Sequence, residues 1–209
     1  MKITSIVLGI IVLLLAGISY YFYDANLKTK KELESKIADI SKENEEEIAS
    51  LKGTYAKLAG SMKDEIEQGQ IKITQMADRL SVTMVDKILF PSGEAKITSE
   101  GVTILTRIGK IIKNNQGKII RVEGHTDNVR ITPRLQQKFP TNWELSTTRA
   151  TNVARFLQDK IGIEGARLRA VGMSEYHPVA SNETLDGRGQ NRRIEIILMP
   201  EPYEMTPKT

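Results

Sequence analysis

Val122-Glu123-Gly124-His125-Thr126-Asp127-Asn128 carries the chain from the apolar end of a predicted strand, 119–124, into a polar turn. Two later pieces have the same character. Asn142-Trp143-Glu144-Leu145-Ser146, which leads to Arg149, begins a predicted helix, and Asn191-Arg192-Arg193 precedes an apolar strand. Carboxylate, guanidinium and carboxamide groups are therefore expected where strands meet helices. Such a site suits a small zwitterion, because Asp binds an ammonium and Arg forks onto a carboxylate.

The order and spacing of these motifs resemble the OmpA-like domain, a peptidoglycan-binding module of envelope proteins. The match extends from about Leu80 to about Met199. The long segment after Asp127 and the run from Phe139 to Ser146 are most similar to the flagellar-stator (MotB) branch of that family. The resemblance implies an OmpA-like fold and a role at the cell wall.

The apolar pattern of residues 80–200 independently predicts alternating strands and helices. An α/β (α+β sandwich) fold of the βαβαββ type follows, with two helices on one face of a mixed four-stranded sheet. Strands are expected at 80–85, 119–124, 168–173 and 193–199, and helices at 98–113 and 142–160. The first helix is expected to be capped by Ser99 or Thr98 and to bury Val102, Leu105, Ile108 and Ile112. The second is expected to bury Leu145, Ala150, Val153, Ala154 and Leu157 and to stop at Gly162.

The resemblance also implies which residues bind the wall. Asp127 and Arg149 match the pair that holds the diaminopimelate of the stem peptide, while Asn142 and Arg192 match positions that line the same pocket; Arg193 is expected to be structural. Taken singly, Asp127 also fits the role of a helix or turn cap, and Arg149 that of a surface ion-pair partner. Arg192 and Arg193 also fit solvated positions beside a strand. Many family members follow the Asp-Asn pair with Thr-Gly, whereas this chain has Val129-Arg130 and a longer loop. Family contacts in that loop therefore cannot be transferred.

Catalysis and metal binding find little support in the sequence. The chain has two histidines, His125 and His177, and no cysteine, and no zinc-ligand spacing occurs. No Gly-x-Ser-x-Gly motif is present, which makes a wall-remodelling enzyme the weakest alternative. No enzyme activity, metal, cofactor or nucleic-acid partner is expected. His125 is expected to hydrogen-bond locally, Gly124 to allow close backbone packing, and Trp143 to pack rather than to act as a stacking platform.

The N-terminal segment predicts a membrane anchor over 1–23. Ile3 to Tyr23 contains no charged residue, and about 20 apolar residues suffice to cross a bilayer as a helix. Tyr20-Tyr21-Phe22-Tyr23 would lie at the membrane interface. A cleaved signal peptide is the alternative, with Lys2 as its basic start, but the apolar run continues past its small residues and no Ala-x-Ala pattern closes it.

Residues 24–79 predict a helical, coiled-coil stalk. The segment has no proline, and core-like positions recur from Leu33 to Leu80 at an average of about 3.6 residues. This stripe has no partner within its own segment, so a second copy of the helix, and hence a homodimer, is expected. A single charged helix is the alternative, and Gly53, Gly60 and Gly69 favour it, because glycine weakens a helix.

Charge separates the stalk from the domain at 80–200. Residues 24–80 carry a net charge of −2, whereas residues 81–209 hold nineteen Lys and Arg against fourteen Asp and Glu, a net of +5. A basic domain favours an anionic polymer. Residues 201–209 are expected to form a flexible tail.

The expected function is that of a non-catalytic, single-pass protein of the cytoplasmic (inner) membrane whose periplasmic domain binds peptidoglycan. Charge around the span leaves its orientation open, so the periplasmic placement follows from the resemblance, because a wall-binding domain must lie outside the cytoplasmic membrane. The alternative is a MotB-like ion-channel stator subunit. A stator needs an ionisable residue inside the membrane, yet Ile3 to Tyr23 has none and Asp24 lies just beyond it.

Overall fold

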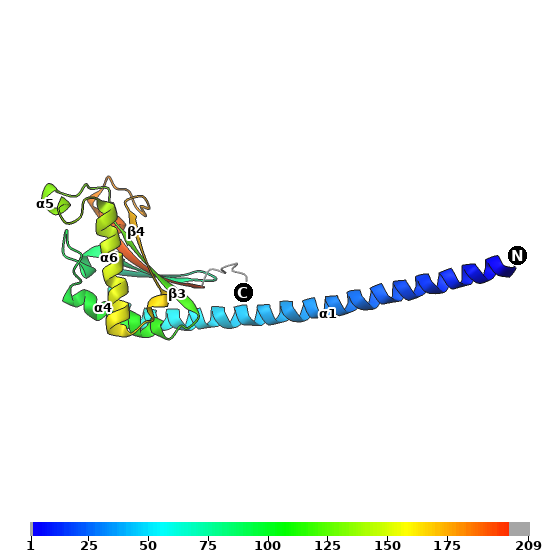
Figure 1. The fold of residues 1–209 in the computed structure, drawn as a ribbon. Coiled ribbons are helices and arrows are strands. Elements are labelled where there is room, and N and C mark those ends of the chain that lie inside the picture. The colour runs from blue at the N-terminus through cyan, green and yellow to red at the C-terminus, as the bar shows by residue number, and fades with distance from the viewer. Residues whose placement is uncertain (1, 201–209) are drawn as a thin grey trace. The chain divides into compact units, whose positions relative to one another are not determined.

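The computed structural model describes residues 2–200, and the predicted tail at 201–209 lies outside the described residues. Two compact units divide the chain, Met1–Glu47 and Ile48–Thr209. The boundary falls within the long helix α1, Lys2–Ser61 (Figure 1).

The described part of the first unit consists of α1 alone. Its stretch from Leu8 is long and apolar enough to cross a membrane, with a mean hydropathy of 1.7 over an 18-residue window, none of which is buried. Further along, Lys28 and Asp24 form an exposed ion pair of 2.7 Å one helical turn apart. The predicted helix is therefore present, while its pairing with a second copy stays a prediction.

The second unit begins with the last turns of α1. Leu51, Leu58 and Met62 are completely buried, so the end of the predicted stalk belongs to the core of the globular unit. Thr54 Oγ1 also donates a hydrogen bond of 2.8 Å to Asn115 Oδ1. The short helix α2, Lys63–Glu67, follows.

The predicted helix does not continue to residue 79. Gly69 adopts a left-handed conformation, with φ at +68°, and strand β1, Ile71–Gln75, begins two residues later. The sheet consequently has five strands rather than the expected four. The helical interpretation was wrong here because the spacing of Ile73, Met76 and Leu80 also fits a strand, a turn and a second strand.

The sheet has the order β1-β2-β5-β3-β4. Its other strands are β2, Leu80–Val85; β3, Lys118–His125; β4, Leu168–Ser174; and β5, Arg193–Pro200. β3 and β4 are parallel, whereas β5 lies antiparallel between β2 and β3. β2, β3 and β4 therefore all end at the same edge of the sheet, where β5 begins.

Two long helices pack on one face of the sheet, α4, Ser99–Lys113, and α6, Asn142–Phe156, which continues as the π-helical turn Leu157–Ile161 (Figure 1). Thr98 is the N-cap of α4 and accepts from the Gly101 amide. Gly162, with φ at +75°, ends the second helix as expected. The remaining short helices are α3, Asp86–Leu89; α5, Pro133–Gln136; the 3-10 turn Gly165–Arg167; and α7, Leu185–Asn191.

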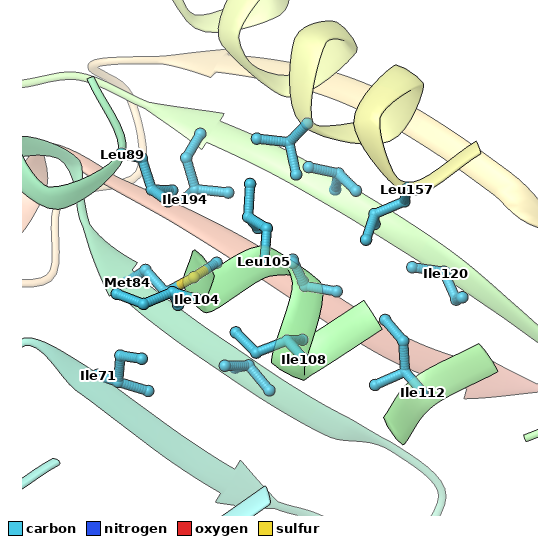
Figure 2. Packing of buried hydrophobic residues seen from close by; sticks show 14 of the residues in the cluster. Ile71, Met84, Leu89, Ile104, Leu105, Ile108, Ile112, Ile120, Leu157 and Ile194 are labelled. Atoms are coloured by element: carbon cyan, nitrogen blue, oxygen red, sulfur yellow. The ribbon is translucent and has the colours of Figure 1, made fainter. Parts of the chain in front are cut away.

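The core lies between these helices and the sheet (Figure 2). Leu105, Ile108 and Ile112 of α4 are buried against the sheet, as predicted. The predicted stripe of the second helix is also buried. Val102 is the exception, because its side chain is 40% exposed on the outer side of α4.

Candidate functional site

Polar residues gather at the edge where β2, β3 and β4 end. Asp86 follows β2 directly, Asp127 comes two residues after β3, and Glu175 follows β4. Arg192 precedes β5 at the same edge, and its backbone carbonyl accepts a hydrogen bond of 2.9 Å from the Asp86 amide. The sheet topology thus brings four separate chain segments together.

Asp127 forms the first ion pair of the site. Its Oδ2 contacts Nη1 of Arg192, and its Oδ1 accepts a hydrogen bond of 3.0 Å from the Val129 amide. The carboxylate is buried, whereas the side chain of Arg192 is 42% exposed. The guanidinium therefore remains accessible to a ligand while it is held over the carboxylate.

Arg149 forms the second ion pair. Its Nη1 lies 3.0 Å from Asp86 Oδ2, its Nε donates to the Glu94 carbonyl at 2.8 Å, and its guanidinium stacks 5.0 Å from the centre of the Phe90 ring. The side chain is only 3% exposed. Asp127 and Arg149 thus do not pair with each other, because Asp127 pairs with Arg192 and Arg149 pairs with Asp86.

The two ion pairs influence each other. Burial raises the pKa of the Asp86 carboxyl to about 6, the cations Arg149 and Arg192 oppose this rise, and the negative charge of Asp127 adds to it. Burial also disfavours the charged form of Arg149 and so lowers its pKa, whereas the negative charge of Asp86 acts to raise it. Asp86 Oδ1 has no hydrogen-bond partner within residues 2–200. One buried acceptor is therefore left for a ligand or a water molecule.

Asn142 organises the loops around Asp127. Its Nδ2 lies 3.3 Å from the Asp127 carbonyl, 3.1 Å from the Val129 carbonyl and 2.6 Å from Glu175 Oε2. Asn142 is the first residue of α6, and Thr141 and Glu144 form a capping box at this helix start. The predicted site residue thus acts as a link between three segments.

A close contact between β3 and α6 places this helix start. A Cβ atom on Gly124 would collide with the backbone carbonyl of Ser146. Ser146 Oγ in turn accepts from the Ser174 amide at 3.1 Å, which joins the same turn of α6 to the end of β4. The prediction that Gly124 permits tight backbone packing is confirmed, and Arg149 lies one helical turn beyond.

His125 has a local role, as expected. Its ring is buried, and its Nε2 lies 3.3 Å from Glu123 Oε2. Burial alone would raise the pKa of Glu123, but the His125 ring and the Arg121 guanidinium hold that pKa below its usual value. Arg193 is buried and donates to Glu195 Oε1 at 2.7 Å, consistent with a structural role. Within residues 2–200, no three His, Asp or Glu side chains form a metal-binding group.

The prediction that Trp143 is a packing residue is wrong. Its side chain is 47% exposed because it stands on the solvent side of the first turn of α6. It contacts the ring of Tyr176, which is 64% exposed.

A groove with a volume of about 820 Å³ leads to the two ion pairs. Asp86 and Arg192 line it, together with Thr83 of β2 and Glu195 of β5. Thr83 and Glu195 alternate with the core residues of their strands, so the groove runs along the sheet face opposite α4 and α6.

Sequence reasoning missed Asp86 and Glu175 as members of this site. Each is an acidic residue directly after a strand that runs parallel to β3. Asp127 was singled out by its motif and by its position after a strand, and the second of these signals applied equally to Asp86 and Glu175. Recognising them required the strand order, which places all three strand ends at one edge.

Comparisons with known proteins agree with this fold. A sequence profile of the OmpA family matches residues 89–192. Motility protein B of Bacillus subtilis (strain 168) is 35% identical over 157 residues, 75% of this chain and 58% of that protein. The chain thus spans little more than half of this curated relative.

Two solved structures share the fold. The cell wall anchor of the T6SS from Pseudomonas aeruginosa has a TM-score of 0.61 and 36% identity, over 69% of this chain and 97% of that one. A MotB like protein from Desulfovibrio vulgaris has a TM-score of 0.68 and 26% identity, over 76% of this chain and 99% of that one.

Proposed function

The chain belongs to the OmpA family, and on that premise we propose that it tethers a membrane to the cell wall by binding peptidoglycan non-covalently. The observation that carries this proposal is the double ion pair at one sheet edge, formed by Asp127, Arg192, Asp86 and Arg149. Two cations and two anions in one cluster, buried except for Arg192, match a ligand that carries both charges.

The diaminopimelate of the stem peptide is such a ligand, because it presents an ammonium and a carboxylate on one carbon. Its carboxylate would bind the accessible guanidinium of Arg192 and the neighbouring Arg149, and its ammonium would bind Asp127. The unpartnered Oδ1 of Asp86 offers a second acceptor for that ammonium. Asn142 would hold the Asp127 loop in place. We assign Asp127, Asn142, Arg149 and Arg192 to the binding site on this basis.

The proposed arrangement has three parts: an uncleaved anchor at 1–23, a helical stalk formed by the part of α1 that follows it, and a wall-binding domain whose compact unit begins at Ile48 rather than at residue 80. The apolar part of α1 supports the anchor, and the compact unit from Ile48 supports the domain. The anchor would lie in the cytoplasmic membrane with the domain in the periplasm, because the wall lies outside that membrane. A homodimer of stalks would bind two sites on one polymer and gain affinity through avidity.

No catalytic role forms part of the proposal. The charged residues of the site are held in ion pairs and backbone hydrogen bonds, an arrangement suited to recognition. A stator role is not favoured, because Ile3 to Tyr23 lacks the ionisable residue that ion transport through a membrane requires. Normal motility in a deletion strain would agree with this view.

Sedimentation with purified sacculi tests the proposal. Asp127→Ala and Arg149→Ala should each abolish co-sedimentation of the full chain while circular dichroism shows an intact fold. Each change removes one partner of a charge pair that would bind the ligand. Asp159→Ala, at an exposed carboxylate in the last turn after α6, is the control and should bind like the wild type. Undiminished binding by both site variants would refute the assignment.

A further inference from the structure

Two aromatic rings stand exposed beside the charged site. The ring centres of Trp143 and Tyr176 are 5.6 Å apart, and the rings are inclined by 32°. Their side chains are 47% and 64% exposed. Large aromatic side chains usually gain stability from burial, so a contacting pair left on the surface indicates a contact surface for a ligand.

The pair is fixed to the site by its neighbours in the chain. Trp143 follows Asn142, and Tyr176 follows Glu175, and the hydrogen bond of 2.6 Å between Asn142 and Glu175 joins the two segments. The Trp143 amide also donates to the N-cap oxygen of Thr141 at 3.1 Å, which holds the ring at the first turn of α6. Asn142 in turn contacts the Asp127 carbonyl. Both rings are therefore placed one residue away from the groups that shape the charged site.

From this geometry we infer that Trp143 and Tyr176 form a stacking surface for a pyranose ring of the glycan to which the bound stem peptide is attached. One face of a pyranose presents C–H groups, which are attracted to the negative face of an aromatic ring. The inference rests on the proposed function, because only a ligand held at Asp127 and Arg192 would bring its sugar to the neighbouring surface. It adds a second chemical class, a saccharide, to the ligand.

Binding of two ligands to the detergent-solubilised full chain tests this inference. One ligand is a diaminopimelate-containing stem peptide without sugar, and the other is the same peptide attached to its disaccharide. Trp143→Ala should weaken binding of the disaccharide-peptide roughly three- to tenfold and leave binding of the free peptide unchanged. Tyr176→Ala should act in the same direction, and Trp143→Phe should restore most of the affinity.

Tyr55→Ala is the matched control. Tyr55 is an aromatic residue of α1 that is 38% exposed. Its neighbour Thr54 bonds to Asn115, which precedes the start of β3, at the opposite end of that strand from Asp127. The control should bind both ligands like the wild type.

Trp143 is the sole tryptophan of the chain, so its fluorescence reports on this surface directly. The disaccharide-peptide should shift or quench the emission more than the free peptide does.

Equal loss of binding of both ligands in Trp143→Ala, or no loss of either, would overturn the inference while leaving the proposed function intact. A change in the molar mass of the Trp143→Ala protein in solution, without a change in its affinity for either ligand, would also overturn the inference, because the two rings would then serve self-association. Failure of the wild type to bind either ligand would instead refute the proposed function.

Discussion

Asp86 is the residue whose environment differs most from that of an ordinary carboxylate. It is buried, one of its oxygens binds Arg149, and the other has no hydrogen-bond partner among the described residues. Its pKa of about 6 in the folded protein exceeds the ordinary value of 3.8. The folded protein therefore binds more protons than the unfolded chain between about pH 4 and pH 6.

This difference predicts a specific pH dependence. The contribution of Asp86 to stability is largest below about pH 4 and falls as the pH rises toward 6, because the buried carboxyl must then ionise. In Asp86→Asn this contribution is absent. The melting temperature of the wild type minus that of the variant should therefore fall between pH 4 and pH 6 and level off above pH 7.

Thermal unfolding followed by circular dichroism over this pH range measures the effect. Asp159→Asn, at an exposed carboxylate, is the control and should not reproduce it. A difference between wild type and Asp86→Asn that stays constant from pH 4 to pH 7 would contradict the prediction.

Among the elements, the contact between β3 and α6 determines the geometry of the site. Gly124→Ala should destabilise the protein by about 1–3 kcal/mol or more, because the added methyl group meets the Ser146 carbonyl and cannot move aside in a backbone-to-backbone contact. The variant should also bind sacculi more weakly, since α6 carries Asn142 and Arg149.

Gly53→Ala provides the matching control for this prediction. No atom lies within 4 Å of a Cβ at Gly53, which is in the helical end of α1. Alanine there should stabilise the protein by up to about 1 kcal/mol. Chemical denaturation of the two variants should therefore give opposite shifts, and a neutral Gly124→Ala would show that the two elements can separate without cost.

The elements also show what the sequence could predict. The helices with a strong apolar stripe, such as α4, were recognised because their buried residues, here Leu105, Ile108 and Ile112, recur in the sequence about every 3.6 residues. β1 was missed because only five residues form it, and Ile73 fits the helical stripe of the preceding segment as well as a strand. Short elements carry too few residues to separate the two periods.

The sequence predicted that four polar residues lie close together, but it did not predict how they pair, and it missed Asp86 and Glu175. Asp127, Asn142, Arg149 and Arg192 lie together around one sheet edge, yet Asp127 pairs with Arg192 and Arg149 pairs with Asp86. Pairing depends on which strand ends are neighbours, and that order, β2-β5-β3, differs from the order in the sequence. The exposed state of Trp143 was missed for a similar reason, because its stacking partner Tyr176 comes from a distant loop.

At the scale of the whole molecule, the compact unit begins earlier than the predicted boundary at residue 80. Leu51, Leu58 and Met62 are fully buried, and the Arg107 guanidinium donates to the Ser61 carbonyl at 2.8 Å and pairs with Glu65. The end of α1 therefore stabilises the domain rather than merely preceding it.

Two truncated chains test this view. A chain that starts at Ile48 should unfold cooperatively with a melting temperature close to that of the globular part of the full protein. A chain that starts at Lys63 loses three fully buried apolar side chains, worth about 1.5–3 kcal/mol each, and should melt roughly 10 °C lower or more. Leu58→Ala in the longer chain should give an intermediate value. Equal melting temperatures for both truncated chains would contradict an integral role for the helix end.

The buried end of α1 has a mechanical consequence. For a protein held at the wall by its domain and in a membrane by its N-terminus, any force that separates the two layers travels along this helix. It enters the domain over three turns, at Leu51, Thr54, Leu58 and Met62, so the load is spread as shear over a packed surface. A flexible hinge after the helix would apply the same load to the domain at a single point. At this junction, by contrast, the helix should separate from the domain only when the packing of the core is disrupted.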